Sequence, residues 1–226
     1  MNQALYDRIG SDYAELRRPD ERIAARVEAA LGRARTVLNV GAGAGSYEPT
    51  NRFVVAVEPS VEMIRQRPRI TPQSIRATAS RLPFSDRAFD ATLAILTIHH
   101  WSPLAEGLAE MRRVSRDRVV IFTWDPMHQG FWLVQDYLPE ILEFDRRIFP
   151  SLNDIERVIG PIDVHVVPVL ADCSDGFLGA YWRRPSAYLN TRVRQAISTF
   201  SKVDSAPAIQ RLQRDIEDGT WGDRYA

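Results

Sequence analysis

A glycine-rich turn directly after an apolar run constrains this chain more than any other feature. Residues 37–49 read VLNVGAGAGSYEP, so the apolar run meets five small residues, Gly41 to Gly45. Glycine permits tight turns and the close approach of backbone to a ligand. The N–H groups of such a turn favour a negatively charged or carboxylate-bearing ligand. The stretch therefore predicts a ligand site at the end of a strand.

Strands and helices alternate along the chain as far as Trp124. The pattern predicts strands at 36–40, 53–58, 74–77, 90–98 and 118–124, with a helix capped by Ser60 and another near 103–114. Continuous apolar strands separated by helices indicate a parallel sheet covered on both faces. The expected fold class is α/β, with a doubly wound and mostly parallel sheet.

The chain is expected to be one domain spanning 1–226, with N-terminal helices at 1–34 and a ligand-binding core at 35–125. Two insertions, at about 127–149 and 171–200, are interpreted as a helical cap over the sheet or, alternatively, as peripheral helices. The stretch IDVHVVPVL at 162–170 is strand-like. A chain of 226 residues is long enough to bury a substantial core.

Composition excludes several classes of function. The formal net charge is zero, which argues against a whole-surface attraction to nucleic acid or acidic membranes. Cys173 is the single cysteine, so an intrachain disulfide is excluded. No apolar run reaches about 18 residues, the length of a membrane span. The expected location is the cytoplasm, and the oligomeric state stays open.

Glu58 ends the second predicted strand, and its position points to a ribose. A carboxylate there can accept hydrogen bonds from ribose hydroxyls. GAGAGS also fits the dinucleotide fingerprint loosely, which alone is a weak signal. No Gly-Lys-Ser/Thr follows the turn, so a phosphate-binding P-loop is excluded.

The downstream residues favour one family. The block ASRLPFSDRAFDATLAILTIHHW at 79–101, taken with the glycine turn, Glu58 and the predicted strand at 118–124, resembles class I S-adenosylmethionine-dependent methyltransferases. It is most similar to the small-molecule (type 11-like) branch, which carries an A-E-x-L-P-F…F-D signature. The resemblance covers about residues 36–124. It implies a Rossmann-like methyltransferase fold, S-adenosyl-L-methionine as cofactor and methyl transfer to a small molecule by in-line displacement.

The same resemblance implies a cofactor site. The matching residues are Gly41, Ala42 and Gly43 under the methionine part, Glu58 at the ribose, Pro59 and Met63 beside the adenine, Ala79 and Ser80 at its edge, and Leu96 beneath the sulfonium. A predicted N-terminal helix at 3–17 would bring Tyr13 to the cofactor or, equally, pack its ring on the sheet. Two residues depart from the family pattern, Asn39 and Ser80, because the family usually has acids there. We therefore expect cofactor binding that is retained but weaker.

His99 and His100 follow the fourth predicted strand. In a doubly wound sheet this strand lies beside the first, so the pair should face the glycine turn at the switch point. Histidine titrates near neutral pH and suits proton removal. Successive strand side chains point apart, so we expect His100 to face the acceptor as the catalytic residue. The alternative is a hydrogen-bonded histidine that shapes the loop. His128 and His165 are far apart, and no metal site is expected.

The cap offers a candidate acceptor pocket. An aromatic pocket beside Arg183 and Arg184 would suit an apolar or aromatic acceptor with an acidic group, although such aromatics are more often cap core. The aromatic residues concerned are Trp101, Trp124, Phe131, Trp132, Phe177, Tyr181 and Trp182.

Two more expectations concern the glycine turn and the helix that follows Ser60. The basic run at 65–69, RQRPR, is expected to be a solvated helix end. Valine at Gly41 or Gly43 is expected to abolish cofactor binding and leave the fold intact, because the first clash would be with the ligand.

Two rival classes of protein remain at this stage. A non-catalytic partner protein or cofactor sensor with a degenerate methyltransferase fold would explain Asn39 and Ser80. A nicotinamide-dependent oxidoreductase would share the glycine turn and Glu58. That second rival is less favoured, because the only lysine, Lys202, has no tyrosine four residues earlier.

Overall fold

The structure, a computed structural model, describes residues 17–68 and 73–226. The described residues fall into two compact units. Unit 1 contains Glu21–Asp125 and Ile148–Val167, and unit 2 contains 17–20, Pro126–Arg147 and Pro168–Ala226. The predicted helix at 3–17, with Tyr13, lies outside the described residues.

Unit 1 is built on a parallel sheet of five strands in the order β3-β2-β1-β4-β5. Their bounds are Thr36–Val40 (β1), Phe53–Val57 (β2), Ser74–Ile75 (β3), Phe89–Ile95 (β4) and Ser115–Phe122 (β5). The predicted parallel sheet is confirmed, and so is the expectation that the fourth strand lies beside the first.

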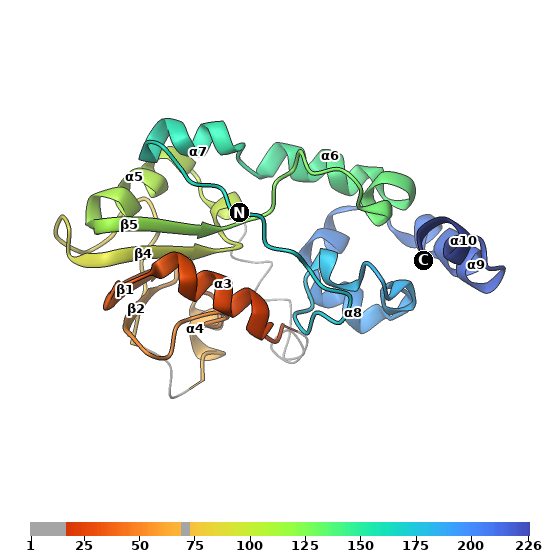
Figure 1. Cartoon of the computed structure of the whole chain (residues 1–226), viewed down its shortest axis with the longest axis horizontal. Helices are drawn as coiled ribbons and strands as arrows, with labels where there is room; N and C mark the ends of the chain where they lie inside the picture. The colour runs from red at the N-terminus through yellow and green to blue at the C-terminus, as the bar shows by residue number, and fades with distance from the viewer. Residues whose placement is uncertain (1–16, 69–72) are drawn as a thin grey trace. The chain divides into compact units, whose positions relative to one another are not determined.

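The helices of unit 1 cover both faces of this sheet (Figure 1). They are α3 (Glu21–Leu31), α4 (Val61–Arg65), the 3-10 helix η1 (Ile98–His100), α5 (Leu104–Val114) and α7 (Leu152–Ile159). Val37 of β1 packs in a core cluster with Leu31 of α3, whereas Leu38 packs in a second cluster with Met111 of α5 and Ile155 of α7. Successive strand residues point to opposite faces, so these two clusters are the two layers of a doubly wound fold.

The sequence explains where two of these helices begin and end. Ile23, Val27 and Leu31 recur at helical spacing and are the buried side of α3. Gly32, with a φ of 55°, follows its last residue, as is common for glycine at the end of a helix. Ser60 caps α4 by accepting a hydrogen bond from the Met63 N–H.

Unit 2 is helical. Its elements are η2 (Leu133–Tyr137), α6 (Pro139–Ile148), η3 (Leu178–Tyr181), η4 (Pro185–Leu189), α8 (Thr191–Ala196), η5 (Ser198–Lys202), α9 (Ala206–Glu217) and α10 (Thr220–Tyr225). Trp132 lies at the centre of its aromatic core, with ring contacts to Tyr137, Tyr188, Trp221 and Tyr225. This tryptophan therefore belongs to the core of unit 2. That unit 2 covers the cofactor stays a prediction.

The strand expected at 162–170 is wrong. These residues belong to no strand or helix, and Val164 and Val166 are 58% and 87% exposed. The alternation of residue types predicts a strand only when a neighbouring strand supplies the hydrogen-bonding ladder. Among the described residues the sheet has no strand beyond β5.

Candidate active site

The glycine turn begins where β1 ends and lies against the end of β2. The N–H groups of Gly41 and Ala42 both donate to the Val57 carbonyl, at 2.8 and 3.0 Å. Gly41 and Gly43 have φ values of 69° and 52°, the left-handed region that favours glycine. The backbone therefore reverses direction within a few residues at the carboxyl edge of the sheet, where ligands bind in doubly wound folds.

Glu58 joins this turn to α4. Its carboxylate is 7% exposed, and its two oxygens accept from the Gly43 and Ser60 N–H groups, each at 2.8 Å. Burial raises the pKa of Glu58, and the two N–H groups and Arg67 offset part of that rise. Glu58 thus lies directly under the turn, with its orientation fixed by backbone donors on both sides.

A buried ion pair also holds the turn, and the sequence does not predict it. Glu48 accepts from Asn39 Nδ2 at 2.9 Å and from Arg67 Nη2 at 2.6 Å, and Arg67 Nη1 donates to the Gly43 carbonyl at 3.2 Å. The side chains of Arg67 and Glu48 are 3% and 5% exposed. The expectation of a solvated helix end at 65–69 is therefore wrong at Arg67.

Glu48 supplies a negative charge close to the position where Asn39 lacks one. Asn39 reaches Glu48 directly, so the carboxylate is one side chain away from the position at which the family usually has an acid. The Oδ1 atom of Asn39 is buried and has no hydrogen-bond partner among the described residues. Nothing in the sequence pairs Glu48 with Arg67, because their contact depends on the path of the turn.

A side chain at Gly41 and one at Gly43 would meet different atoms. At Gly41 this corrects the expectation that a side chain would clash with the ligand before it clashes with the protein. A Cβ on Gly41 would lie 2.3 Å from Thr97 Oγ1. Among the described residues, a Cβ on Gly43 would meet only Met63 Cε, at 3.4 Å. At Gly41 the first clash is therefore within the protein.

We expect Gly41→Val to destabilise the fold as well as to abolish cofactor binding, and Gly43→Ala to weaken binding with a smaller loss of stability. Crowding against Thr97 costs about 1–3 kcal/mol, in addition to backbone strain at a positive φ. Thermal unfolding together with calorimetry would measure both effects. Gly130→Ala is a control, since its φ is 97° and no described residue lies within 4 Å of its Cβ position. Equal losses of stability for Gly41→Val and Gly43→Ala would contradict this prediction.

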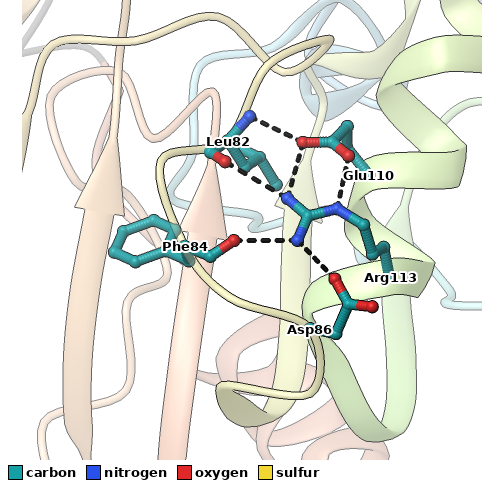
Figure 2. Close-up of polar contacts among 5 residues, drawn as sticks. All are labelled: Leu82, Phe84, Asp86, Glu110 and Arg113. Carbon is teal, nitrogen blue, oxygen red and sulfur yellow. Dashed lines mark hydrogen bonds and ion pairs between the residues drawn. The ribbon is translucent and has the colours of Figure 1, made fainter.

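The Leu-Pro-Phe segment ahead of β4 is fastened to α5 by one arginine (Figure 2). Arg113 donates to the carbonyls of Phe84 and Leu82 at 2.8 and 3.2 Å and to Asp86 at 2.8 Å. Glu110 accepts from Arg113 Nε at 2.6 Å and from the Leu82 N–H at 2.8 Å. Hydrogen bonding from Arg113 lowers the pKa of Glu110. This loop clamp sets the path of the chain into β4.

The histidine pair lies in a 3-10 helix rather than at a strand end, because β4 stops at Ile95. The two rings are in contact, with centroids 3.8 Å apart, so the expectation that they point apart is wrong. His99 also stacks on Phe149 at 4.1 Å. Burial, followed by the charge of His100, lowers the pKa of His99 to about 2, so His99 is neutral at physiological pH. His100 stays the candidate catalytic residue.

The other predicted site residues lie at two places in unit 1. Met63, on α4, is 6% exposed and approaches Gly43, and the carbonyl of the neighbouring Pro59 accepts from Arg76. Ala79 packs in the core cluster that also holds Trp101, and the Ser80 hydroxyl lies 3.3 Å from that of Thr78.

Leu96 follows β4 with a φ of 47°, which is unusual for a residue with a branched side chain. Its N–H donates to the Phe122 carbonyl at 2.8 Å, which holds it at the carboxyl edge of the sheet. Backbone strain of this kind clusters at functional sites.

The parallel sheet, the glycine turn and the buried carboxylate after β2 together define a Rossmann-like nucleoside-binding protein. Residues 38–123 match the methyltransferase domain family. A crystal structure from Anabaena variabilis, assigned as a methyltransferase of an antibiotic biosynthesis pathway, is similar over 93% of this chain and 91% of that one, with 31% identity and a TM-score of 0.85. The chain therefore belongs to the class I S-adenosylmethionine-dependent methyltransferases: it is an enzyme, and S-adenosylmethionine is its cofactor.

Two further crystal structures match part of this chain. A methyltransferase from Thermotoga maritima is 20% identical over 60% of this chain and 66% of its own, with a TM-score of 0.48. One from Aquifex aeolicus is 19% identical over 70% and 86%, also with a TM-score of 0.48.

The described residues contain neither a helix that could cross a membrane nor a cluster of side chains typical of a metal site. No helix in 17–68 or 73–226 has the length and apolar character needed to cross a membrane. No three His, Cys, Asp or Glu side chains in those ranges gather as a metal site would require.

Proposed function

We propose that this enzyme transfers the methyl group of S-adenosylmethionine to a small-molecule acceptor by in-line displacement, in the cytoplasm. The observation that carries the proposal is the junction of the glycine turn and Glu58. The Gly43 N–H and the Glu58 carboxylate are already joined at 2.8 Å, at the end of a strand that lies beside β4. A nucleoside with an amino-acid tail needs a ribose acceptor and a tight turn in this arrangement.

The residues present fit that cofactor. A Cβ has no room at Gly41, and at Gly43 Met63 is the one described residue that comes within 4 Å of the Cβ position. Glu58 supplies a buried acceptor for hydroxyl donors, and the orphaned Oδ1 of Asn39 is a further acceptor beside the turn. We propose that Gly41, Ala42, Gly43 and Glu58 hold the cofactor, with Pro59, Met63, Ala79, Ser80, Leu96 and Tyr13 around it.

Methyl transfer requires the protein mainly to position the two reactants. S-adenosylmethionine supplies an activated methyl group, and its sulfur leaves as a neutral thioether, so the leaving group needs no acid. Holding the reactants in line can supply most of the rate enhancement. An acceptor that begins protonated needs a base in contact with it. We assign that role to His100, because the neighbouring His99 is buried and has a pKa far below neutrality.

The first experiment measures ligand binding by calorimetry. We expect the chain to bind S-adenosylmethionine and S-adenosylhomocysteine and not NAD. Turnover would then be followed with labelled methyl groups over a panel of small phenols, amines, thiols and carboxylic acids. Binding of NAD alone would contradict the proposal, as would cofactor binding without turnover of any small acceptor.

We expect Glu58→Ala to weaken cofactor binding by about 1.5–3 kcal/mol, the usual value of a hydrogen bond to a charged group. Calorimetry with S-adenosylhomocysteine measures this without turnover. Glu62→Gln is the matched control, because Glu62 is a partly exposed acid on the adjacent α4, ion-paired to Arg65 at 3.7 Å. An unchanged dissociation constant in Glu58→Ala would remove Glu58 from the site.

A further inference from the structure

Unit 2 contains a cavity that is lined, among the described residues, by none of those assigned to the cofactor. Its volume is about 430 Å³, within the range of small-molecule sites. Its walls come from the segment before α3, the loop ahead of η3, and the residues around η3, η4 and α8. The lining residues are Arg18, Asp172, Cys173, Ser174, Tyr181, Arg184, Asn190, Arg192 and Val193.

Positive charge dominates this cavity. Three arginines line it, Arg18, Arg184 and Arg192, against one carboxylate, Asp172. The Cys173 thiol adds no negative charge, because burial raises its pKa. Guanidinium groups bind carboxylate and phosphate oxygens through paired N–H donors. The lining therefore favours an oxyanion.

Arg184 is held in place by its own protein contacts. Its Nη2 donates to the Cys173 carbonyl at 2.6 Å and to the Ala180 carbonyl at 2.9 Å, and its guanidinium carbon lies 4.8 Å from the centre of the Tyr181 ring. Within the described residues, Nε and Nη1 of Arg184 make no hydrogen bond. One edge of the guanidinium is thus anchored, and donors on the other edge are available to a ligand.

The cavity walls are held by polar contacts within unit 2. Asp175, which is 1% exposed, accepts from Arg17 Nε at 2.7 Å, and Asp20 accepts from the Ser174 N–H at 3.1 Å. Asn190 Oδ1 accepts from the Arg192 N–H at 2.9 Å. Preorganised donors lose less entropy when a ligand binds.

The wall beside the arginines is apolar. Tyr181 and Val193 are both buried, at 9% and 8% exposure, and both line the cavity. A ligand that places an oxyanion on the guanidinium groups can therefore set its apolar part against Val193 and Tyr181, beside the Arg184 guanidinium that lies over the Tyr181 ring.

We propose that this cavity binds the oxyanion group of an aromatic methyl acceptor, a carboxylate or a phosphate. The inference rests on the proposed function, because it takes the occupant to be the acceptor. It narrows the substrate class from small molecules in general to aromatic acids or aryl phosphates. It also assigns acceptor recognition to unit 2 and to Arg184 and Arg192 in particular.

The test uses the full chain and three probes of similar shape: benzoate, phenyl phosphate and neutral benzamide. Binding is measured by calorimetry, with and without S-adenosylhomocysteine. We expect at least one anion to bind about tenfold or more tightly than benzamide, because charge-assisted hydrogen bonds to arginine are lost with the neutral probe. The stronger of the two anions identifies the group. Equal binding of benzamide and both anions would overturn the proposal.

Variants locate the site. We expect Arg184→Gln and Arg192→Gln each to weaken anion binding about tenfold, and binding should weaken with added salt because these side chains are exposed. Arg192→Gln is the safer of the two for folding, because Arg184 also holds two carbonyls. Arg147→Gln is the matched control, since it removes the same charge from an exposed arginine of unit 2 that does not line the cavity.

Cofactor affinity separates this inference from the proposed function. We expect both cavity variants to bind S-adenosylmethionine within about twofold of the wild type. If they lose cofactor affinity and keep anion affinity, the cavity serves the cofactor and the inference is overturned, while the proposed function stands. If the wild type binds no S-adenosylmethionine, the proposed function itself fails.

Discussion

We expect the effect of Asp145→Asn on the free energy of unfolding to be more stabilising at about pH 8 than at about pH 4, by roughly 4 kcal/mol. Asp145 lies on α6 and is 5% exposed. Its Oδ1 is buried and has no hydrogen-bond partner among the described residues. Burial raises the pKa of Asp145 to about 7 from an ordinary value of 3.8.

The direction follows from where the proton is held. Below about pH 4 the aspartate is protonated in both the folded and the unfolded chain, so it imposes no penalty. As the pH rises to about 7, the unfolded chain releases the proton and the folded chain keeps it, so stability falls. Above that pH the charge is buried and the penalty is constant. Asparagine has no proton to release, so its advantage grows over this window.

Chemical denaturation at several pH values would measure the difference between wild type and variant. Glu143→Gln is the matched control, because Glu143 lies on the same helix with a side chain that is 67% exposed. We expect that control to change the free energy of unfolding by less than about 0.5 kcal/mol at any pH. A pH-independent effect of Asp145→Asn would show that the carboxylate is ionised in the folded chain.

His100→Ala should lower kcat by about 10²–10⁴-fold and leave the affinity for S-adenosylmethionine nearly unchanged. The reason is that methyl transfer to a protonated acceptor stalls without a base. The limb of the pH–rate profile in which the rate rises with pH should disappear with the imidazole. The assay follows labelled methyl transfer to whichever acceptor the panel identifies.

The outcome distinguishes a base from a residue that shapes the loop. A smaller loss that falls mainly on the acceptor KM would contradict the base role and indicate positioning. His128→Ala is the control, because His128 is exposed and the sequence gives it no role. Phe149→Leu tests the stack behind the pair, since Phe149 lies against His99 and not in the proposed reaction path.

Contacts local in sequence were predictable, and contacts set by chain path were not. The strand at 36–40 and the Ser60 cap follow from periodicity and from one side chain, and the place of the fourth strand beside the first follows from the fold class. The burial of Arg67 could not be predicted, because its partner Glu48 lies on the other side of the glycine turn. A run of charged residues looks the same in a sequence whether or not the fold supplies an ion-pair partner for one of them.

The same distinction holds at the candidate site. The position of Glu58 beside Gly43 follows from the end of one strand and the turn after its neighbour. The crowding at Gly41 does not, since it depends on Thr97 from another strand end. The expectation that the two histidine side chains point apart is wrong because β4 stops at Ile95, and a 3-10 helix places successive rings differently from a strand.

The loop clamp, formed by Arg113 and Glu110, gives the Leu-Pro-Phe signature a structural meaning. Arg113 grips the carbonyls of Leu82 and Phe84, which are main-chain atoms, and Glu110 takes a main-chain N–H. The block that identifies the family thus holds the backbone ahead of β4 in place, and we assign it no part in binding the acceptor. We expect relatives that share these letters to enter β4 in the same way. By our proposal, the choice of acceptor depends instead on residues such as those that line the arginine cavity of unit 2.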